Sequence, residues 1–176
     1  MQVQADEIRL KAVGGIYWLA SAMEVRSRLW LGGTISKHRD RQLIRRLLSR
    51  GRRCGPVDRV LMVTDGLTSY APQALHVLRE ALYTGRRGPP RLVLAEGVRI
   101  ARVKKRYQRR QVVEVIREVV AGSRAEVISR LIATQPSMEA LINTAYIERL
   151  KATFRSRLAP LVRRSRGGAH KHRYAL

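Results

Sequence analysis

Three acidic residues of this sequence have the types and the surroundings that metal-dependent phosphodiester chemistry requires. Asp6 falls in a short segment of mixed polarity, Asp65 directly follows an aliphatic run, and Glu148 falls in a helical pattern. Such chemistry needs carboxylates from separate elements that converge on two metal ions roughly 3.5–4 Å apart. Mg²⁺ prefers a few carboxylates together with water and phosphate oxygens. We therefore regard these three acids as candidate catalytic ligands of two Mg²⁺ or Mn²⁺ ions.

Basic residues surround Glu148 at helical spacing. At about 100° per residue, Lys151 lies about 60° from Glu148 and Arg155 about 20° from it, so one helix face carries an acid and two cations. Such a face can bind a metal through the acid and flanking phosphates through the cations. The alternative is an ordinary Glu–Lys ion pair, three residues apart, on a solvated helix.

The other acidic residues are weaker candidates. Glu7 follows Asp6, and alternation along a strand directs its side chain to the opposite face, so we do not expect Glu7 to bind a metal. Asp58 precedes its strand and is typical of a surface charge. Four further acids are rivals for the third position but lack the basic surroundings of Glu148. They are Glu96, Glu114, Glu118 and Glu139.

Hydropathy patterns predict the elements that must position these acids. The predicted order is β-β-β-α-β-α-β, in which an antiparallel meander precedes a helix and a parallel strand. This layout is typical of an α/β fold of ribonuclease-H-like type, with a mixed sheet flanked by helices. The predicted strands are Val3–Leu10, Ile16–Val25, Arg28–Ile35, Val57–Thr64 and Arg91–Ala95, and the predicted helices are Ser36–Arg53 and Pro72–Tyr83.

Residues 97–135 are expected to form an insertion before the last, catalytic helix. Two β-branched segments flank a basic stretch and predict a β-hairpin, and a capping-box pattern at Ser123 and Glu126 opens a helix. The predicted ranges are Val98–Val103 and Gln111–Val120 for the hairpin strands, Lys104–Arg110 for their connection, Arg124–Thr134 for the capped helix and Asn143–Leu158 for the last helix.

The charge of the chain favours a polyanionic partner. Its 176 residues include 36 Lys and Arg against 13 Asp and Glu, a formal net charge of +23. A strongly positive field attracts polyanions, and the arginine fork suits phosphate oxygens. A high-GC genome would explain the preference for Arg over Lys, but not the excess over acids. We therefore expect DNA as the partner. The predicted DNA contacts are Lys104, Lys105, Arg106, Arg149, Lys151, Arg155 and Arg157.

Composition also bears on domain organisation and location. One domain is expected over residues 1–162, followed by a basic, flexible tail over residues 163–176. The single cysteine, Cys54, excludes an internal disulfide and a cysteine-based zinc site. No signal-peptide pattern or membrane-spanning apolar run is visible. We therefore expect a cytoplasmic, nucleoid-associated protein without a membrane partner.

Three segments resemble the acidic motifs of DDE transposases of bacterial insertion sequences. They are QADE (Gln4–Glu7), VTDGLTSY (Val63–Tyr70) and NTAYIERLKATFRSRL (Asn143–Leu158), and the resemblance covers essentially the whole chain. It implies that Asp6, Asp65 and Glu148 form the metal-binding triad and that Arg155 is the basic residue that follows the Glu. Related sequences usually carry Asn where this one has Lys151.

The resemblance implies metal-dependent DNA cleavage and strand transfer. Water attacks at a transposon end, and the freed 3′ hydroxyl then attacks target DNA; a homo-oligomer on DNA is also expected. Such transposases normally carry an N-terminal DNA-recognition domain. Asp6 lies five residues after Met1, so we expect that domain to be absent, either because it is encoded elsewhere or because this copy is truncated. The alternative is a non-catalytic basic DNA-binding protein or an inactive transposase remnant.

Overall fold

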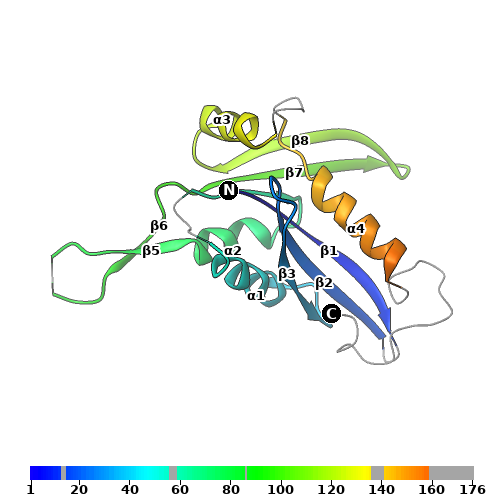
Figure 1. Cartoon of the computed structure of the whole chain (residues 1–176), viewed down its shortest axis with the longest axis horizontal. Helices are drawn as coiled ribbons and strands as arrows, with labels where there is room; N and C mark the ends of the chain where they lie inside the picture. The colour runs from blue at the N-terminus through cyan, green and yellow to red at the C-terminus, as the bar shows by residue number, and fades with distance from the viewer. Residues whose placement is uncertain (13–14, 56–58, 86, 136–140, 159–176) are drawn as a thin grey trace.

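A mixed six-stranded sheet forms the centre of the protein (Figure 1). The computed structural model describes residues 1–12, 15–55, 59–85, 87–135 and 141–158. The meander of the first three strands is antiparallel, as predicted, and the strands on the other side of β1 run parallel to it until the last one reverses. In spatial order the strands are β3 (Trp30–Ser36), β2 (Gly15–Glu24), β1 (Gln2–Ala12), β4 (Leu61–Asp65), β7 (Arg99–Gln108) and β8 (Gln111–Ala121).

Helices cover both faces of this sheet, which confirms the predicted α/β class (Figure 1). On β4, Met62 packs into the core beneath the first two helices, whereas its neighbours Leu61 and Val63 pack against the third. This alternation buries β4 on both faces, as expected for a central parallel strand. The helices are α1 (Arg41–Arg52) and α2 (Tyr70–Val77) on one face and α3 (Arg124–Thr134) and α4 (Ala145–Arg157) on the other.

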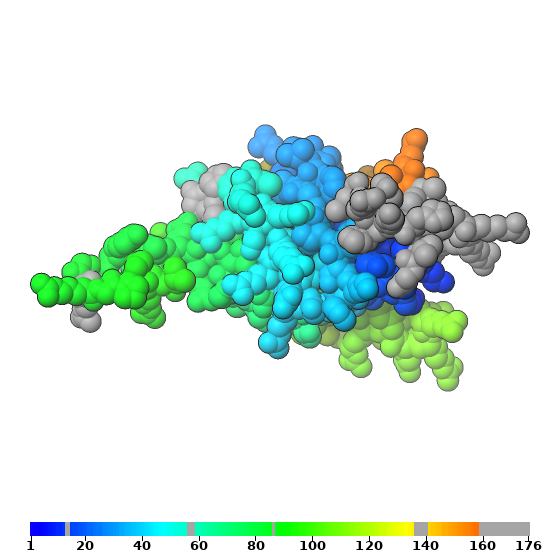
Figure 2. Space-filling model, turned by 90° about the horizontal axis from the view of Figure 1, so that it is seen from below, coloured from blue at the N-terminus to red at the C-terminus, as the bar shows by residue number. Residues whose placement is uncertain are grey.

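The predicted helix over Pro72–Tyr83 is wrong beyond Val77. The chain leaves α2 there and forms β5 (Arg79–Leu82), which pairs antiparallel with β6 (Arg91–Leu94). These two strands form a separate ribbon that does not join the main sheet and that extends away from the body in both views (Figures 1 and 2). The first predicted helix is also shorter than expected, because Asp40 caps it by accepting a hydrogen bond from Leu43 N at 2.9 Å.

The hairpin predicted within residues 97–135 is confirmed, but it is not an insertion set apart from the sheet. β7 pairs with β4 from Leu61↔Arg99 to Asp65↔Val103, so its first half is a central strand, and β8 forms the edge. Pairing between the two hairpin strands continues to Gln108↔Gln111. Most of the stretch expected as a connection, Lys104–Arg110, is therefore strand.

Ser123 caps α3 through the reciprocal hydrogen bonds that the capping-box pattern predicts. Its Oγ accepts a hydrogen bond from Glu126 N at 3.3 Å, and its backbone N donates to the Glu126 carboxylate at 2.8 Å. Arg99 also donates to this carboxylate. The hydrogen bond from Arg99, together with those from Ser123, lowers the pKa of Glu126 to about 2.

We expect Ser123→Ala to lower the free energy of unfolding by about 1 kcal/mol, because the α3 amino terminus loses its cap. Urea denaturation at pH 7 measures this change, and Ser156→Ala on the exposed surface of α4 is the control, with an expected change below about 0.5 kcal/mol. The ionised Glu126 carboxylate adds its full contribution to the free energy of unfolding above its ordinary pKa of 4.5. This contribution is lost as the pH falls toward 2. The loss of stability caused by Ser123→Ala should therefore become smaller as the pH falls from 4.5 toward 2. Equal urea midpoints for Ser123→Ala and Ser156→Ala at pH 7 would contradict the capping role.

Some predicted features lie outside the described residues, namely the tail over residues 163–176, Asp58 and Glu139. Within the described ranges, no helix combines the length and the apolar character that crossing a bilayer requires.

Candidate metal centre

Asp6 and Asp65 lie side by side where two parallel strands run together. β1 and β4 pair from Gln2↔Leu61 to Ala5↔Thr64, so the two aspartates occupy the next register position. β4 ends at Asp65, whereas β1 continues past Asp6 to Ala12. The register of one parallel pair therefore brings together two acids that are far apart in the sequence.

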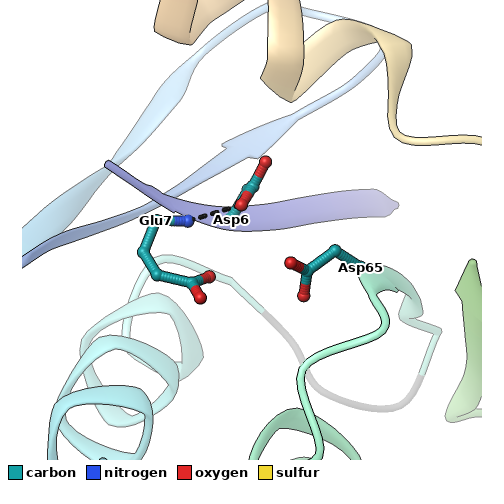
Figure 3. A group of neighbouring side chains, drawn as sticks. All are labelled: Asp6, Glu7 and Asp65. Atoms are coloured by element: carbon teal, nitrogen blue, oxygen red, sulfur yellow. Dashed lines mark hydrogen bonds between the residues drawn. The ribbon is translucent and has the colours of Figure 1, made fainter. Parts of the chain in front are cut away.

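The Glu7 carboxylate lies close to those of the two aspartates. One carboxylate oxygen from each of Asp6, Glu7 and Asp65 lies within 4.8 Å of the others. Figure 3 shows the side chains of Asp6 and Glu7 leaving β1 on opposite sides, as strand alternation requires, with the Asp65 carboxylate facing them from β4. Because β4 ends at Asp65, no strand on that side separates the two faces of β1. The predicted alternation is therefore confirmed, although Glu7 still approaches the aspartates, and its expected absence from the metal ligands stays a prediction.

The Glu7 side chain is completely buried and is held by two donors. Arg39 Nε donates to it at 2.5 Å, and the Tyr70 hydroxyl donates at 3.0 Å. Burial, and then the charge of Asp65, raises the pKa of Glu7 in spite of the arginine. Arg39 also lies 3.8 Å from Asp65 Oδ2 and 4.9 Å from the centre of the Trp18 ring. Glu7 therefore fixes a cation at the edge of the acidic cluster.

Asp65 has a raised pKa for related reasons. Burial is the main cause, and the neighbouring Asp6 charge adds to it. The hydrogen bond that Asp65 Oδ1 accepts from Leu67 N, at 3.0 Å, works in the opposite direction but does not compensate. A carboxylate in this environment is stabilised by any additional positive charge that approaches it.

Glu148 lies on α4 and is paired with cations rather than with the other acids. Its Oε1 accepts hydrogen bonds from Lys105 Nζ at 2.8 Å and from Thr144 Oγ1 at 2.9 Å. Burial raises the pKa of Glu148, but these two hydrogen bonds outweigh burial and leave the pKa lowered. Lys151, on the same helix, donates to Asp6 Oδ2. Glu148 is thus outside the group of three close carboxylates, although the adjacent Lys151 bridges α4 to that group.

Gln4 fixes α4 against β1. This fully buried side chain donates to Asn143 O at 2.9 Å, and its Oε1 accepts from Ile147 N at 3.0 Å. It thereby satisfies a backbone donor in the first turn of α4, which has no partner within the helix. The contact places Glu148, the next residue, beside the strand that carries Asp6. Sequence reasoning missed this role, although a polar residue in a buried strand was a usable signal.

One cavity of about 1080 Å³ connects these residues. Its acidic lining residues are Asp6, Glu7, Asp65 and Glu148, and its basic ones are Arg39, Lys104, Lys105, Arg106, Lys151 and Arg155. Five of the seven predicted DNA contacts are therefore in its wall, and Arg39 is an addition. Arg149 and Arg157 are not among the described residues that line it, nor are the rival acids Glu96, Glu114 and Glu118.

The arrangement suits a cation and a polyanion together. Carboxylate oxygens are the ligands that Mg²⁺ and Mn²⁺ prefer, and two of the carboxylates at the centre have raised pKa values. The surrounding lysines and arginines carry the complementary charge for phosphate groups. A divalent ion at the acids and a phosphodiester across the cavity would satisfy both sets of charges.

No protein-family model, curated protein or solved structure matches the chain. Its function is therefore inferred from the residues of the cavity and from the elements that carry them.

Proposed function

We propose that this chain catalyses metal-dependent cleavage and strand transfer of DNA, as a DDE transposase with a ribonuclease-H-like catalytic domain. The observation that supports this proposal is the cavity in which acids from β1, β4 and α4 meet a wall of lysines and arginines. The mixed sheet, with an antiparallel meander and two parallel strands beside β1, is compatible with that fold.

Asp6, Asp65 and Glu148 would hold two Mg²⁺ or Mn²⁺ ions. When bound, such ions activate the attacking oxygen and stabilise the leaving oxygen of a phosphodiester. The oxygen donors fit these ions, and the burial that raises the pKa of Asp65 makes a nearby cation favourable. The cavity is large enough for phosphate groups and water beside the acids.

The basic residues around the acids would hold the DNA backbone. Lys151 and Lys105 contact Asp6 and Glu148, and in the ion-loaded site both ammonium groups are available for phosphate oxygens. Arg155 lines the same cavity from α4. Arg39 approaches from the opposite side, held by Glu7. The flat guanidinium groups suit bidentate contacts with phosphate.

The proposal is tested by cleavage of DNA that carries the sequences flanking the gene of this chain. We expect purified protein to nick end-labelled duplexes in Mg²⁺ or Mn²⁺ and to leave them intact in EDTA, as measured on denaturing gels. Cleavage at the same rate in EDTA would contradict a metal-dependent mechanism.

A non-catalytic DNA-binding protein, such as an inactive transposase remnant, is the second candidate. The ion pairs Lys151–Asp6 and Lys105–Glu148 favour it, because each neutralises a proposed ligand without a metal ion. In that case the protein binds DNA with an affinity that falls as salt rises, and it cleaves in neither metal. The same assay, run with a parallel binding measurement, separates the two candidates.

A further inference from the structure

The β7–β8 hairpin extends well past the acidic residues. β7 pairs with β4 as far as Asp65↔Val103 and then continues through Lys104–Gln108. At about 3.3 Å per residue, these additional residues carry the strand roughly 17 Å farther. Lys104, Lys105, Arg106 and Tyr107 line the cavity on the way. The hairpin runs past the start of α4 in Figure 1, and its yellow-green end protrudes in Figure 2.

Two arginines form the turn at the end of this hairpin. Gln108 pairs with Gln111, which leaves Arg109 and Arg110 as a two-residue loop. Their φ angles are 47° and 69°. A two-residue hairpin loop with positive φ at both positions is of type I′, for which Asn-Gly is strongly preferred. A side chain with a Cβ is disfavoured in this conformation, so these arginines are not there to stabilise the turn.

Arg109 and Arg110 also differ from the preceding cations in their partners. Each basic residue on β7 that precedes the turn forms a salt bridge: Arg99 with Glu126, Arg102 and Lys104 both with Glu118, Lys105 with Glu148 and Arg106 with Glu114. Arg109 and Arg110 are exposed, and across the described ranges they make no salt bridge. The tip of the hairpin therefore carries two adjacent cations that no carboxylate of the described residues neutralises.

We propose that the Arg109–Arg110 turn binds the phosphate backbone of duplex DNA that lies across the cavity. This inference rests on the proposed function for its ligand, but it adds a contact outside the acidic site. A projection of roughly 17 Å corresponds to about five base-pair steps of 3.4 Å each. The turn would thus contact phosphates about five base pairs away from the phosphodiester bond that lies at Asp65 in the proposed function. Strained residues with unbalanced charge are a reason to expect function at this position.

The test is the double variant Arg109→Asn/Arg110→Gly, which gives the turn its preferred residues and removes two charges. We expect it to melt at a higher temperature than wild type and yet to bind DNA about tenfold more weakly at 0.1 M salt. The slope of log affinity against log salt should fall by about 1.8, because each phosphate contact contributes about 0.9. Fluorescence anisotropy without divalent ions measures binding, and differential scanning fluorimetry measures stability.

Two controls separate charge, position and conformation. Arg109→Lys/Arg110→Lys keeps the charges and should bind within about threefold of wild type. Arg45→Gln/Arg46→Gln removes two exposed charges from α1, and it should lose much less affinity than the Asn-Gly variant. The inference is overturned if the Asn-Gly variant binds as tightly as wild type, or if the α1 variant loses as much, since net charge would then explain the result. Wild-type protein that binds no DNA would overturn the proposed function itself.

Discussion

Asp65→Asn should abolish metal-dependent cleavage while DNA binding stays the same or becomes tighter. Asparagine keeps the size of the side chain and can keep the hydrogen bond from Leu67 N, which is 3.0 Å long in the wild-type protein. It removes a negative charge that the proposed ions need, so the rate should fall by several orders of magnitude. Binding should not suffer, because the lost charge repels phosphate in a cavity lined by cations.

The measurement is single-turnover cleavage of end-labelled DNA in Mg²⁺ and in Mn²⁺, with anisotropy for binding. Asp40→Asn is the matched control. It makes the same chemical change at the amino terminus of α1, where Asn caps about as well as Asp, and it should leave cleavage unchanged. Equal cleavage by wild type and Asp65→Asn would exclude the DDE mechanism for this chain.

Glu148→Gln and Glu7→Gln should have very different effects on cleavage. We expect Glu148→Gln to reduce the rate about as severely as Asp65→Asn, because it removes the proposed third ligand. Glu7→Gln should retain the rate within about tenfold, because the amide oxygen can still accept the hydrogen bond from Arg39 while the amide NH2 can donate to the Tyr70 hydroxyl oxygen. Burial raises the pKa of Glu7, so loss of its charge removes a desolvation cost that offsets part of the lost attraction to Arg39.

These two variants also show whether the third metal ligand is Glu148, as the sequence motif predicts, or Glu7, as its distance from the aspartates would suggest. Among the acids that the structure describes, Glu7 is the one that lies within 4.8 Å of both aspartates, whereas Glu148 lies in the segment that resembles the third transposase motif. An inactive Glu7→Gln with an active Glu148→Gln would assign the third ligand to Glu7. Circular dichroism and melting of both proteins establish whether any loss of activity reflects unfolding.

Local patterns predicted most of the sheet and the strands that carry the aspartates. Alternating and aliphatic segments identified β1, β2, β3 and β4, because side chains in these strands pack against helices at regular intervals. The capping box at Ser123 predicted the start of α3 because it depends on residues three positions apart. The motif around Glu148 likewise identified α4, whose apolar stripe includes the buried Ile147.

Features that depend on distant contacts were not visible in the sequence. Leu78 and Leu82 continue the helical spacing of α2, yet residues 79–82 pair with β6, and this pairing with a segment that was itself predicted as a strand overrides the local helical pattern. The position of Glu7 also depends on a neighbour, because β4 ends beside it and leaves its long side chain free to approach Asp65. Alternation describes one strand and carries no information about where its partner ends.

The Gln4 contact with α4 has a consequence for the order in which the protein acquires its structure. It joins residues 143 positions apart, and contacts of such separation form late because a long loop must be closed first. A chain emerging from the ribosome holds Asp6 and Asp65 well before residues 143–158 can dock on β1. On the proposed function, neither a nascent nor a partly unfolded chain would cut DNA. Competence for a reaction that damages the genome is in this way tied to completion of the whole domain.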